Sequence, residues 1–494
     1  MKIAGLDIGT TGCKLTVFDQ NGVYLDKAYQ DYPVKRKSGE HEVDADAILD
    51  GVLSVMKEVC SKHPDIMGIG VTSFGETFVM TDENAKPLHQ AMIYTDPRGI
   101  EECKELEEHF GGRDLASITG TKPHEMYSIS KMMWIKRNKP EIYEKTRHIF
   151  LMEDYVVHGL TGVAQIDYSL ATRTMAFDIT SLKWCDEIFD YAEIDKNLMS
   201  KPVPTGTPAG KISPEIAEKT GLNPEAVIVS VCHDQIAAAV GANVFDSEKA
   251  VDGAGTVECI TPIYDEVPEL DAMYEGSYSV VPYVIPGKYV CYAFSYTGGA
   301  LVQWCTETIG RKEKEEAKEK GISVFDYLEG EFSEPTGMLV LPHFAGAATP
   351  YMDMGSKGAI LGLTMSTTLS EIYRACMEGV VYEMVLNMEY LKKSGVDFKM
   401  LHATGGGAKS SVWMQMKADM LNVPVKALEV ADAGTVGSAM LTGIATGCFK
   451  DLEDAAAHMV KEKHVYYPNQ EMHEKYMKIY ERYRSLYHAI RPLM

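Results

Sequence analysis

The first part of the chain alternates apolar and polar positions in a way that predicts short strands joined by tight turns. Residues 3–6 and 13–18 are the expected strands, and residues 7–12, rich in glycine and threonine, form the expected turn between them. Asn21-Gly22 predicts a second hairpin turn, because both residues tolerate positive φ. The chain is therefore expected to open with a hairpin whose turn is built from glycine and threonine.

Further along, apolar residues recur at helical spacing in some segments and form short continuous runs in others. Buried strands are predicted at residues 66–71 and 227–232. The predicted helices are 44–62, 99–110, 131–138, 364–393, 412–421 and 434–443, with another from Ile236. Thr368 and Glu371 form a capping-box signature inside the longest of these segments.

The opening pattern returns halfway along the chain. A shift of 245 positions places Asp7 on Asp252 and Thr11 on Thr256, within the segment Gly253-Ala254-Gly255-Thr256. Because this shift is close to half the chain length, it predicts a duplicated domain. We expect one domain over residues 1–245 and a second over residues 246–494.

Composition narrows the classes of protein to which the chain can belong. It has 494 residues, 45% of them hydrophobic, which is enough for at least two packed domains. The formal charge of −23 argues against a nucleic acid or an anionic membrane as partner. Ten cysteines without a C-x-x-C pair argue against a zinc ribbon or a thioredoxin-type site. Without a long apolar run or a signal-peptide pattern, we expect a soluble cytoplasmic protein.

The two glycine and threonine turns are candidates for phosphate binding. Glycine allows several backbone N–H groups to point at one anion, and Thr10, Thr11 and Thr256 add hydroxyl donors. Lys14 adds a positive charge, and Asp7 is a candidate to hold Mg²⁺ through water. The alternative is an ordinary hairpin turn in which threonine satisfies the backbone.

A third glycine cluster, Thr404-Gly405-Gly406-Gly407-Ala408-Lys409-Ser410-Ser411, lies between a predicted strand and a predicted helix. It is neither a Walker A sequence nor a dinucleotide-binding fingerprint. A run of glycines lets a flat ring lie against the backbone, which favours an adenosine site. A helix N-cap at Ser410 or Ser411 is the alternative, and the sequence leaves both open.

Carboxylates follow two of the predicted strands. Asp234 comes after strand 227–232, where α/β enzymes place catalytic groups, but a helix N-cap is the alternative. His233 beside it is expected to be a packed or surface side chain. Glu76, after strand 66–71, is a candidate to bind hydroxyl groups. Asp96 and Arg98 form either a structural ion pair or a ligand contact.

Two longer segments resemble the signatures of the FGGY carbohydrate kinases, the group that contains xylulokinase, gluconokinase and glycerol kinase. The first runs from Met126 through Lys131 and Trp134 to Asn138. The second runs over residues 358–363 and continues through residues 371–378. The resemblance extends from residue 3 to at least residue 447. It implies an α/β fold of two actin-like (ribonuclease-H-like) ATPase domains with a cleft between them.

The resemblance also implies roles for single residues. Asp234 would be the catalytic base, with Gln235 as a neighbouring substrate ligand, and Asp7 would begin the first phosphate motif. The implied substrate site contains Glu76, Thr77, Tyr94, Asp96, Arg98, Met126 and Gln235. The implied nucleotide site contains Thr10, Thr11, Lys14, Gly255, Thr256, Gly299, Gln303, Gly406, Gly407, Ser410 and Ser411.

These residues predict a kinase that uses ATP and Mg²⁺ to phosphorylate a hydroxyl of a small sugar, polyol or sugar acid, and a homodimer. The sugar loop departs from the family: Phe74-Gly75-Glu76 replaces the usual xylulokinase residues, and Tyr94 replaces a usual tryptophan. Val257-Glu258 departs in the second phosphate turn. The alternatives are a nucleotide-driven chaperone or assembly protein on the same fold, and an inactive sugar sensor.

Overall fold

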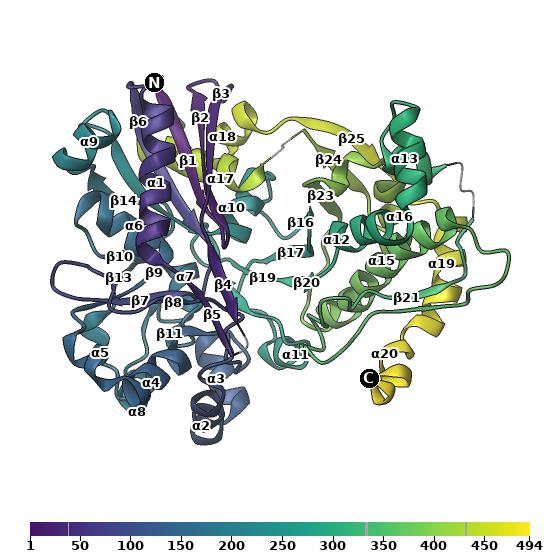
Figure 1. The fold of residues 1–494 in the computed structure, drawn as a ribbon, viewed down its shortest axis with the longest axis horizontal. Helices are drawn as coiled ribbons and strands as arrows, with labels where there is room; N and C mark the ends of the chain where they lie inside the picture. The colour runs from purple at the N-terminus through teal and green to yellow at the C-terminus, as the bar shows by residue number, and fades with distance from the viewer. Residues whose placement is uncertain (38, 331–333, 430–431) are drawn as a thin grey trace.

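The computed structural model describes residues 1–494 except 38, 331–333 and 430–431. The chain folds into two halves that lie side by side, one coloured mainly purple to teal and the other mainly teal to yellow (Figure 1). Each half is built around its own mixed β-sheet with helices packed on it. The α/β class and the two-part architecture expected from the sequence are therefore confirmed.

The sheet of the first half has six strands in the order β14-β15-β6-β1-β2-β3. Its strands are β1 (Lys2–Ile8), β2 (Gly12–Asp19), β3 (Tyr24–Asp31), β6 (Ile66–Ser73), β14 (Thr207–Lys211) and β15 (Val227–His233). Strands β1, β6 and β15 run parallel, and Ser73 pairs with both Ile8 and His233. The carboxyl ends of the three strands therefore meet at one edge, where α/β proteins place their ligands.

The second half repeats this arrangement in an eight-stranded sheet. Its strands are β16 (Lys249–Ala254), β17 (Glu258–Tyr264), β18 (Val280–Pro282), β19 (Tyr289–Cys291), β20 (Ala293–Ser295), β23 (Met400–Thr404), β24 (Val425–Leu428) and β25 (Glu462–Tyr466). As β1 does with β2 and β6, strand β16 forms a hairpin with β17 and pairs in parallel with β23. The internal repeat seen in the sequence is thus present in the topology.

The helices follow the predicted segments with shifted ends. The corresponding helices are α1 (Ala45–Cys60), α2 (Ile100–Phe110), α4 (Ser128–Asn138), α10 (Asp234–Gly241), α15 (Leu369–Lys393), α16 (Ser411–Leu421) and α17 (Ala433–Ala445). Helix α15 begins later than residue 364 because the Thr368 and Glu371 capping box fixes its start. The charged segment 310–321 contains α13 (Arg311–Glu319), followed by α14 (Val324–Glu329).

A smaller five-stranded sheet, in the order β4-β5-β8-β7-β9, lies in the first half. Its strands are β4 (Val34–Lys37), β5 (Glu40–Val43), β7 (Phe78–Thr81), β8 (Ala91–Met92) and β9 (His148–Leu151). The remaining helices of this half include α3 (Gly112–Thr119), α5 (Pro140–Lys145), α6 (Met152–Thr161), α7 (Tyr168–Thr172), α8 (Asp186–Ala192) and α9 (Pro214–Thr220). Two predicted substrate residues lie next to strands of this sheet: Thr77 directly precedes β7, and Tyr94 follows β8.

Helix α17 comes from the second half of the chain but packs against α10 and β1 of the first half. A Cβ on Gly437 would lie 1.9 Å from the Ala237 carbonyl oxygen, so only glycine allows this backbone approach. The Ser438 hydroxyl adds a hydrogen bond of 2.8 Å to the Gly70 carbonyl of β6. The two halves are therefore joined through α10 and α17, and the boundary at residue 245 stays a prediction.

The ten cysteines form no disulfide, and eight of them are buried. Such burial is typical of cysteines that pack as small apolar side chains. Over the part of the chain that the structure describes, each helix is too short or too polar to cross a membrane.

Candidate active site

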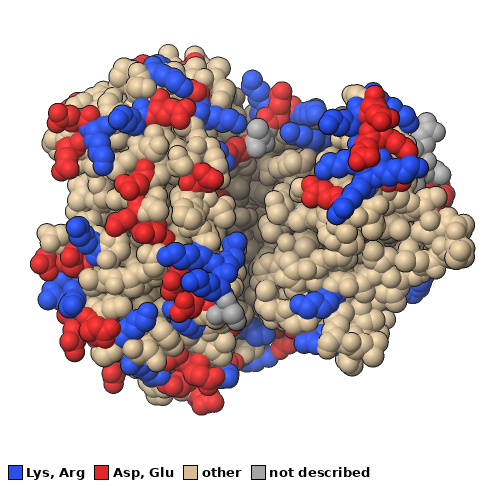
Figure 2. Space-filling view, in the orientation of Figure 1, with Lys and Arg blue, Asp and Glu red and all other residues tan. Residues whose placement is uncertain are grey.

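The site lies where the carboxyl ends of the central strands of both halves face each other. Figure 2 shows the surface hollowed into a groove between the halves, with acidic and basic side chains interspersed over the outer surface of this face. The turns after β1 and β16 and the segments after β6, β15 and β23 all end at this edge of their sheets. The topology thus gathers most of the residues singled out in the sequence.

A pocket of about 580 Å³ lies in the second half. Its lining residues are Gly255, Thr256, Gly299, Ala300, Val302, Gln303, Ser323, Phe325, Asp326, Glu329, Tyr373, Gly406, Gly407, Lys409, Ser410 and Trp413. Seven of the predicted nucleotide residues are among them, whereas Ser411 begins α16. The volume and the mixture of aromatic and polar lining suit a nucleoside.

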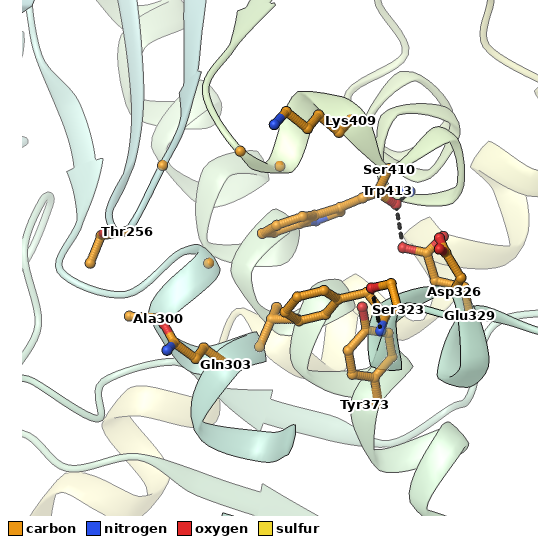
Figure 3. Close-up of a pocket in the computed structure, with 16 residues that line it drawn as sticks. Thr256, Ala300, Gln303, Ser323, Asp326, Glu329, Tyr373, Lys409, Ser410 and Trp413 are labelled. Carbon is orange, nitrogen blue, oxygen red and sulfur yellow. Dashed lines mark hydrogen bonds between the residues drawn. The ribbon is translucent and has the colours of Figure 1, made fainter. Parts of the chain in front are cut away.

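The pocket has two chemically different ends. In Figure 3, Thr256 and Gln303 lie at one end and Asp326 and Glu329 at the other, with the Trp413 indole along the wall between them. The Ser410 hydroxyl donates to Glu329 Oε1 at 2.6 Å and accepts from the Trp413 backbone N–H at 3.0 Å. The Ser410 N-cap predicted from sequence is therefore present, and the same residue lines the pocket.

Sequence patterns alone did not predict the wall of this pocket that lies across from the glycine run. Ser323, Phe325, Asp326 and Glu329 come from α14 and the residue that caps it, and Tyr373 comes from α15. The Phe325 and Tyr373 ring centroids lie 6.5 Å apart. The hydroxyl of Ser323, which accepts from the Phe325 N–H, was a helix-start signal that could have marked this segment.

The glycine and threonine turn of the second half is held by the start of α12 (Gly299–Trp304). The Gly299 N–H donates to the Gly255 carbonyl at 2.8 Å, and the Ala300 N–H donates to the Thr256 carbonyl at 3.1 Å. Thr256 itself is exposed at the tip of the turn. The start of α12 thus holds this turn in place, and Thr256 lines the pocket.

The corresponding turn of the first half carries Thr10 and Thr11 and is braced by Tyr32, whose hydroxyl donates to the Gly9 carbonyl. Lys14 Nζ lies 3.8 Å from Asp7 and forms a second ion pair with Asp432 at the start of α17. Burial, opposed by Lys14, raises the pKa of Asp7 to about 6. A partly exposed carboxylate beside a turn of this kind suits Mg²⁺, which favours one carboxylate together with waters and phosphate oxygens.

Asp234 is the first residue of α10, directly after β15. The residue in the N-cap position is His233, which makes no side-chain cap, so the alternative of Asp234 as an N-cap is wrong. Asp234 Oδ1 is buried without a hydrogen-bond partner, although the side chain as a whole is 30% exposed. Burial and the nearby charge of Asp7 raise the pKa of Asp234 to about 7. Such a carboxyl group changes its charge near neutral pH.

A buried network fixes the backbone that carries Asp234. The His233 N–H donates to the Ser169 hydroxyl at 2.9 Å, and that hydroxyl donates to Asp167, which caps α7. His233 itself is buried, so the packed alternative holds and not the surface one, and its ring centroid lies 5.4 Å from that of Tyr292. The end of β15 is therefore held by contacts with both α7 and the second half.

Glu76 forms a buried ion pair with Arg173, a residue that the sequence analysis did not select. Arg173 also lies over the Tyr127 ring at 5.2 Å and the Tyr292 ring at 5.8 Å. The Arg173 Nη1 atom and the Tyr292 hydroxyl are buried without hydrogen-bond partners. Glu76 adopts a φ of 61°, a strained conformation for a residue with a side chain and one that clusters at functional sites.

The other predicted substrate residues differ in their surroundings. Burial raises the pKa of Tyr94, and the charges of Glu76 and Asp234 raise it further, so Tyr94 lies near both carboxylates. Asp96, in contrast, accepts hydrogen bonds from Arg98 Nε at 2.9 Å and from the His41 N–H at 2.7 Å. For Asp96 and Arg98 the geometry favours the structural ion pair. Thr77 is buried, and Met126 and Gln235 are partly exposed.

This chain is similar to known proteins over nearly its whole length. Family models described as the N-terminal and C-terminal domains of the FGGY family of carbohydrate kinases match residues 2–241 and 259–446. The chain is 27% identical to a xylulose kinase of Bacillus subtilis (98% of this chain, 96% of the relative). It is 28% identical to a gluconokinase of Bacillus licheniformis (98% and 95%). The structure of a ligand-bound xylulose kinase from Lactobacillus acidophilus has the same fold, with a TM-score of 0.89, 24% identity and coverage of 99% and 98%.

Proposed function

The chain belongs to the FGGY family of carbohydrate kinases, and from this premise we propose that it transfers the γ-phosphate of ATP to a hydroxyl of a small sugar, polyol or sugar acid, with Asp234 as the general base. The observation that carries the proposal is the position of Asp234 at the end of β15. The charges of both Asp7 and Glu76 act on its carboxyl group. It therefore lies close to the proposed metal site and to the proposed substrate site.

The chemistry follows from the charges that these residues supply. The ionised Asp234 carboxylate accepts the proton of the attacking hydroxyl, a task that fits a carboxyl group with a pKa near neutrality. The backbone N–H groups of the two turns, the Thr256 hydroxyl and Lys14 stabilise the negative charge on the transferring phosphoryl group. When bound through Asp7, Mg²⁺ would neutralise phosphate charge.

The nucleoside is assigned to the 580 Å³ pocket, with its base along Trp413 and its phosphates toward Thr256. The acceptor is assigned to the cluster around Glu76, Arg173, Tyr94 and Tyr292. Tyr292 belongs to the second half, and its ring lies beside His233 of the first half. Closure of the two halves would therefore bring both around the acceptor and exclude water from the reacting groups.

The pH dependence of the reaction tests the role of Asp234. The base must be ionised, and burial holds its pKa at about 7. We therefore expect kcat/KM for the acceptor to fall about tenfold for each pH unit below 7 and to level off above it. The measurement is a pH profile of ADP release at saturating MgATP. A profile that stays flat between pH 5 and pH 8 would exclude a base with this pKa.

A further inference from the structure

Lys417 is a buried cation that the mechanism above does not use. It lies on α16, and its side chain is only 1% exposed. A lysine is almost never buried this completely unless its charge is paired. The structure supplies the partners from the other side of the nucleotide pocket.

Lys417 Nζ donates to Asp252 Oδ2 at 2.7 Å and to Glu258 Oε1. Both carboxylates are fully buried and lie on the β16–β17 hairpin. Asp252 pairs with Ile260 and Glu258 pairs with Ala254, so the two acids are diagonal neighbours on one face of the hairpin. They flank the turn that carries Gly255 and Thr256.

The same lysine contacts the other wall of the pocket. Its Nζ lies 5.0 Å from the centroid of the Trp413 ring, one helical turn earlier on α16. Trp413 in turn packs on the glycine run, where a Cβ on Gly407 would lie 3.0 Å from both the Trp413 ring and the Ala254 Cβ. Lys417 therefore joins the stem of the phosphate turn to the aromatic wall.

The charges make this arrangement rigid. Burial by itself lowers the pKa of Lys417, but the charges of Asp252 and Glu258 outweigh it and keep the lysine protonated. Removing one partner of such a cluster leaves an uncompensated buried charge, so the hairpin stem and α16 hold their relative position only while all three groups are present.

We propose that Lys417 is a positioning residue for the nucleotide, which sets the Gly255 and Thr256 turn against the wall formed by Trp413. This inference rests on the proposed function, in which Thr256 meets the γ-phosphate and Trp413 the base. It gives a role to Glu258, one of the residues by which the second phosphate turn departs from the family pattern. The adenine base can then contact Trp413 while the phosphates of the same nucleotide reach the Gly255 and Thr256 turn.

The test is the contribution of the phosphates to nucleotide affinity, measured by calorimetry without an acceptor. We expect Lys417→Met to lower the ratio of the adenosine Kd to the MgATP Kd about tenfold, while the adenosine Kd itself changes by less than about threefold. Glu258→Gln, which keeps the lysine paired with Asp252, should lower the ratio by a smaller factor. If Lys417→Met does not fold, the affinity ratio of Glu258→Gln decides whether the cluster positions the nucleotide.

Glu383→Gln is the matched control. Glu383 is also buried in the second half, but its partners are His343 and Tyr483. This variant should lower the melting temperature and leave the affinity ratio unchanged. A ratio that stays within about twofold of the wild type in folded Lys417→Met and in Glu258→Gln would overturn the positioning role. Wild-type protein that binds MgATP but transfers no phosphate would overturn the proposed function alone, and wild-type protein that binds no MgATP would overturn both.

Discussion

Asp234→Asn is expected to lower kcat by about 10³-fold, within the range that a positioned general base contributes. Asparagine keeps the size and one acceptor oxygen of the side chain, but it takes up no proton from a hydroxyl. The Kd for MgATP should change little, because the pocket that we assign to the nucleoside is lined by the second half. The measurement pairs ADP release under saturating substrates with calorimetric binding of MgATP.

Stability supplies an internal check on this variant. The folded protein raises the pKa of Asp234, so ionisation of the group works against folding above its unfolded pKa. Asp234→Asn should therefore be at least as stable as the wild type at pH 8. The matched control is Asp44→Asn, which alters the N-cap of α1 and should leave kcat unchanged. An Asp234→Asn enzyme with wild-type turnover would exclude this residue as the base.

Glu76→Gln should lower kcat/KM for the acceptor by about 100-fold, which corresponds to about 3 kcal/mol for a hydrogen bond to a charged group. Glutamine removes the charge that pairs with Arg173, so the guanidinium and the two tyrosine rings around it lose their fixed arrangement. The KM for ATP should stay within about threefold, because Glu76 is not among the residues that line the pocket assigned to the nucleoside.

Glu105→Gln is the matched control, because Glu105 forms an exposed ion pair with Arg137. Neither KM should change in that variant. If Glu76→Gln instead raised the KM for ATP and left the acceptor KM as it was, the substrate site would have been assigned to the wrong part of the groove.

Sequence alone located the features that depend on neighbouring residues. The two glycine and threonine turns, the strand before Asp234 and the Ser410 N-cap all follow from local patterns, and the structure contains each of them. The internal repeat at 245 positions predicted the two related sheets. The family signatures added the carbohydrate kinase class, which local patterns do not carry.

The features that sequence reasoning missed depend on contacts between distant residues. Arg173 lies 97 positions from Glu76, and neither its spacing nor its neighbours mark it as a partner. Lys417 is 159 positions from Glu258, on a helix whose apolar pattern gives no reason to expect a buried cation. The packing of α17 on α10 depends on Gly437 and Gly241, which in the sequence are two glycines among many.

The central claim is that the chain phosphorylates a small polyhydroxylated molecule with ATP. The most direct measurement is ADP release by the wild-type protein with MgATP across pentuloses, hexuloses, polyols and aldonates, run beside Asp234→Asn. We expect acceptor-dependent ADP release for at least one of these classes and its loss in Asp234→Asn. ADP release that is independent of every acceptor, or equal in both proteins, would contradict it.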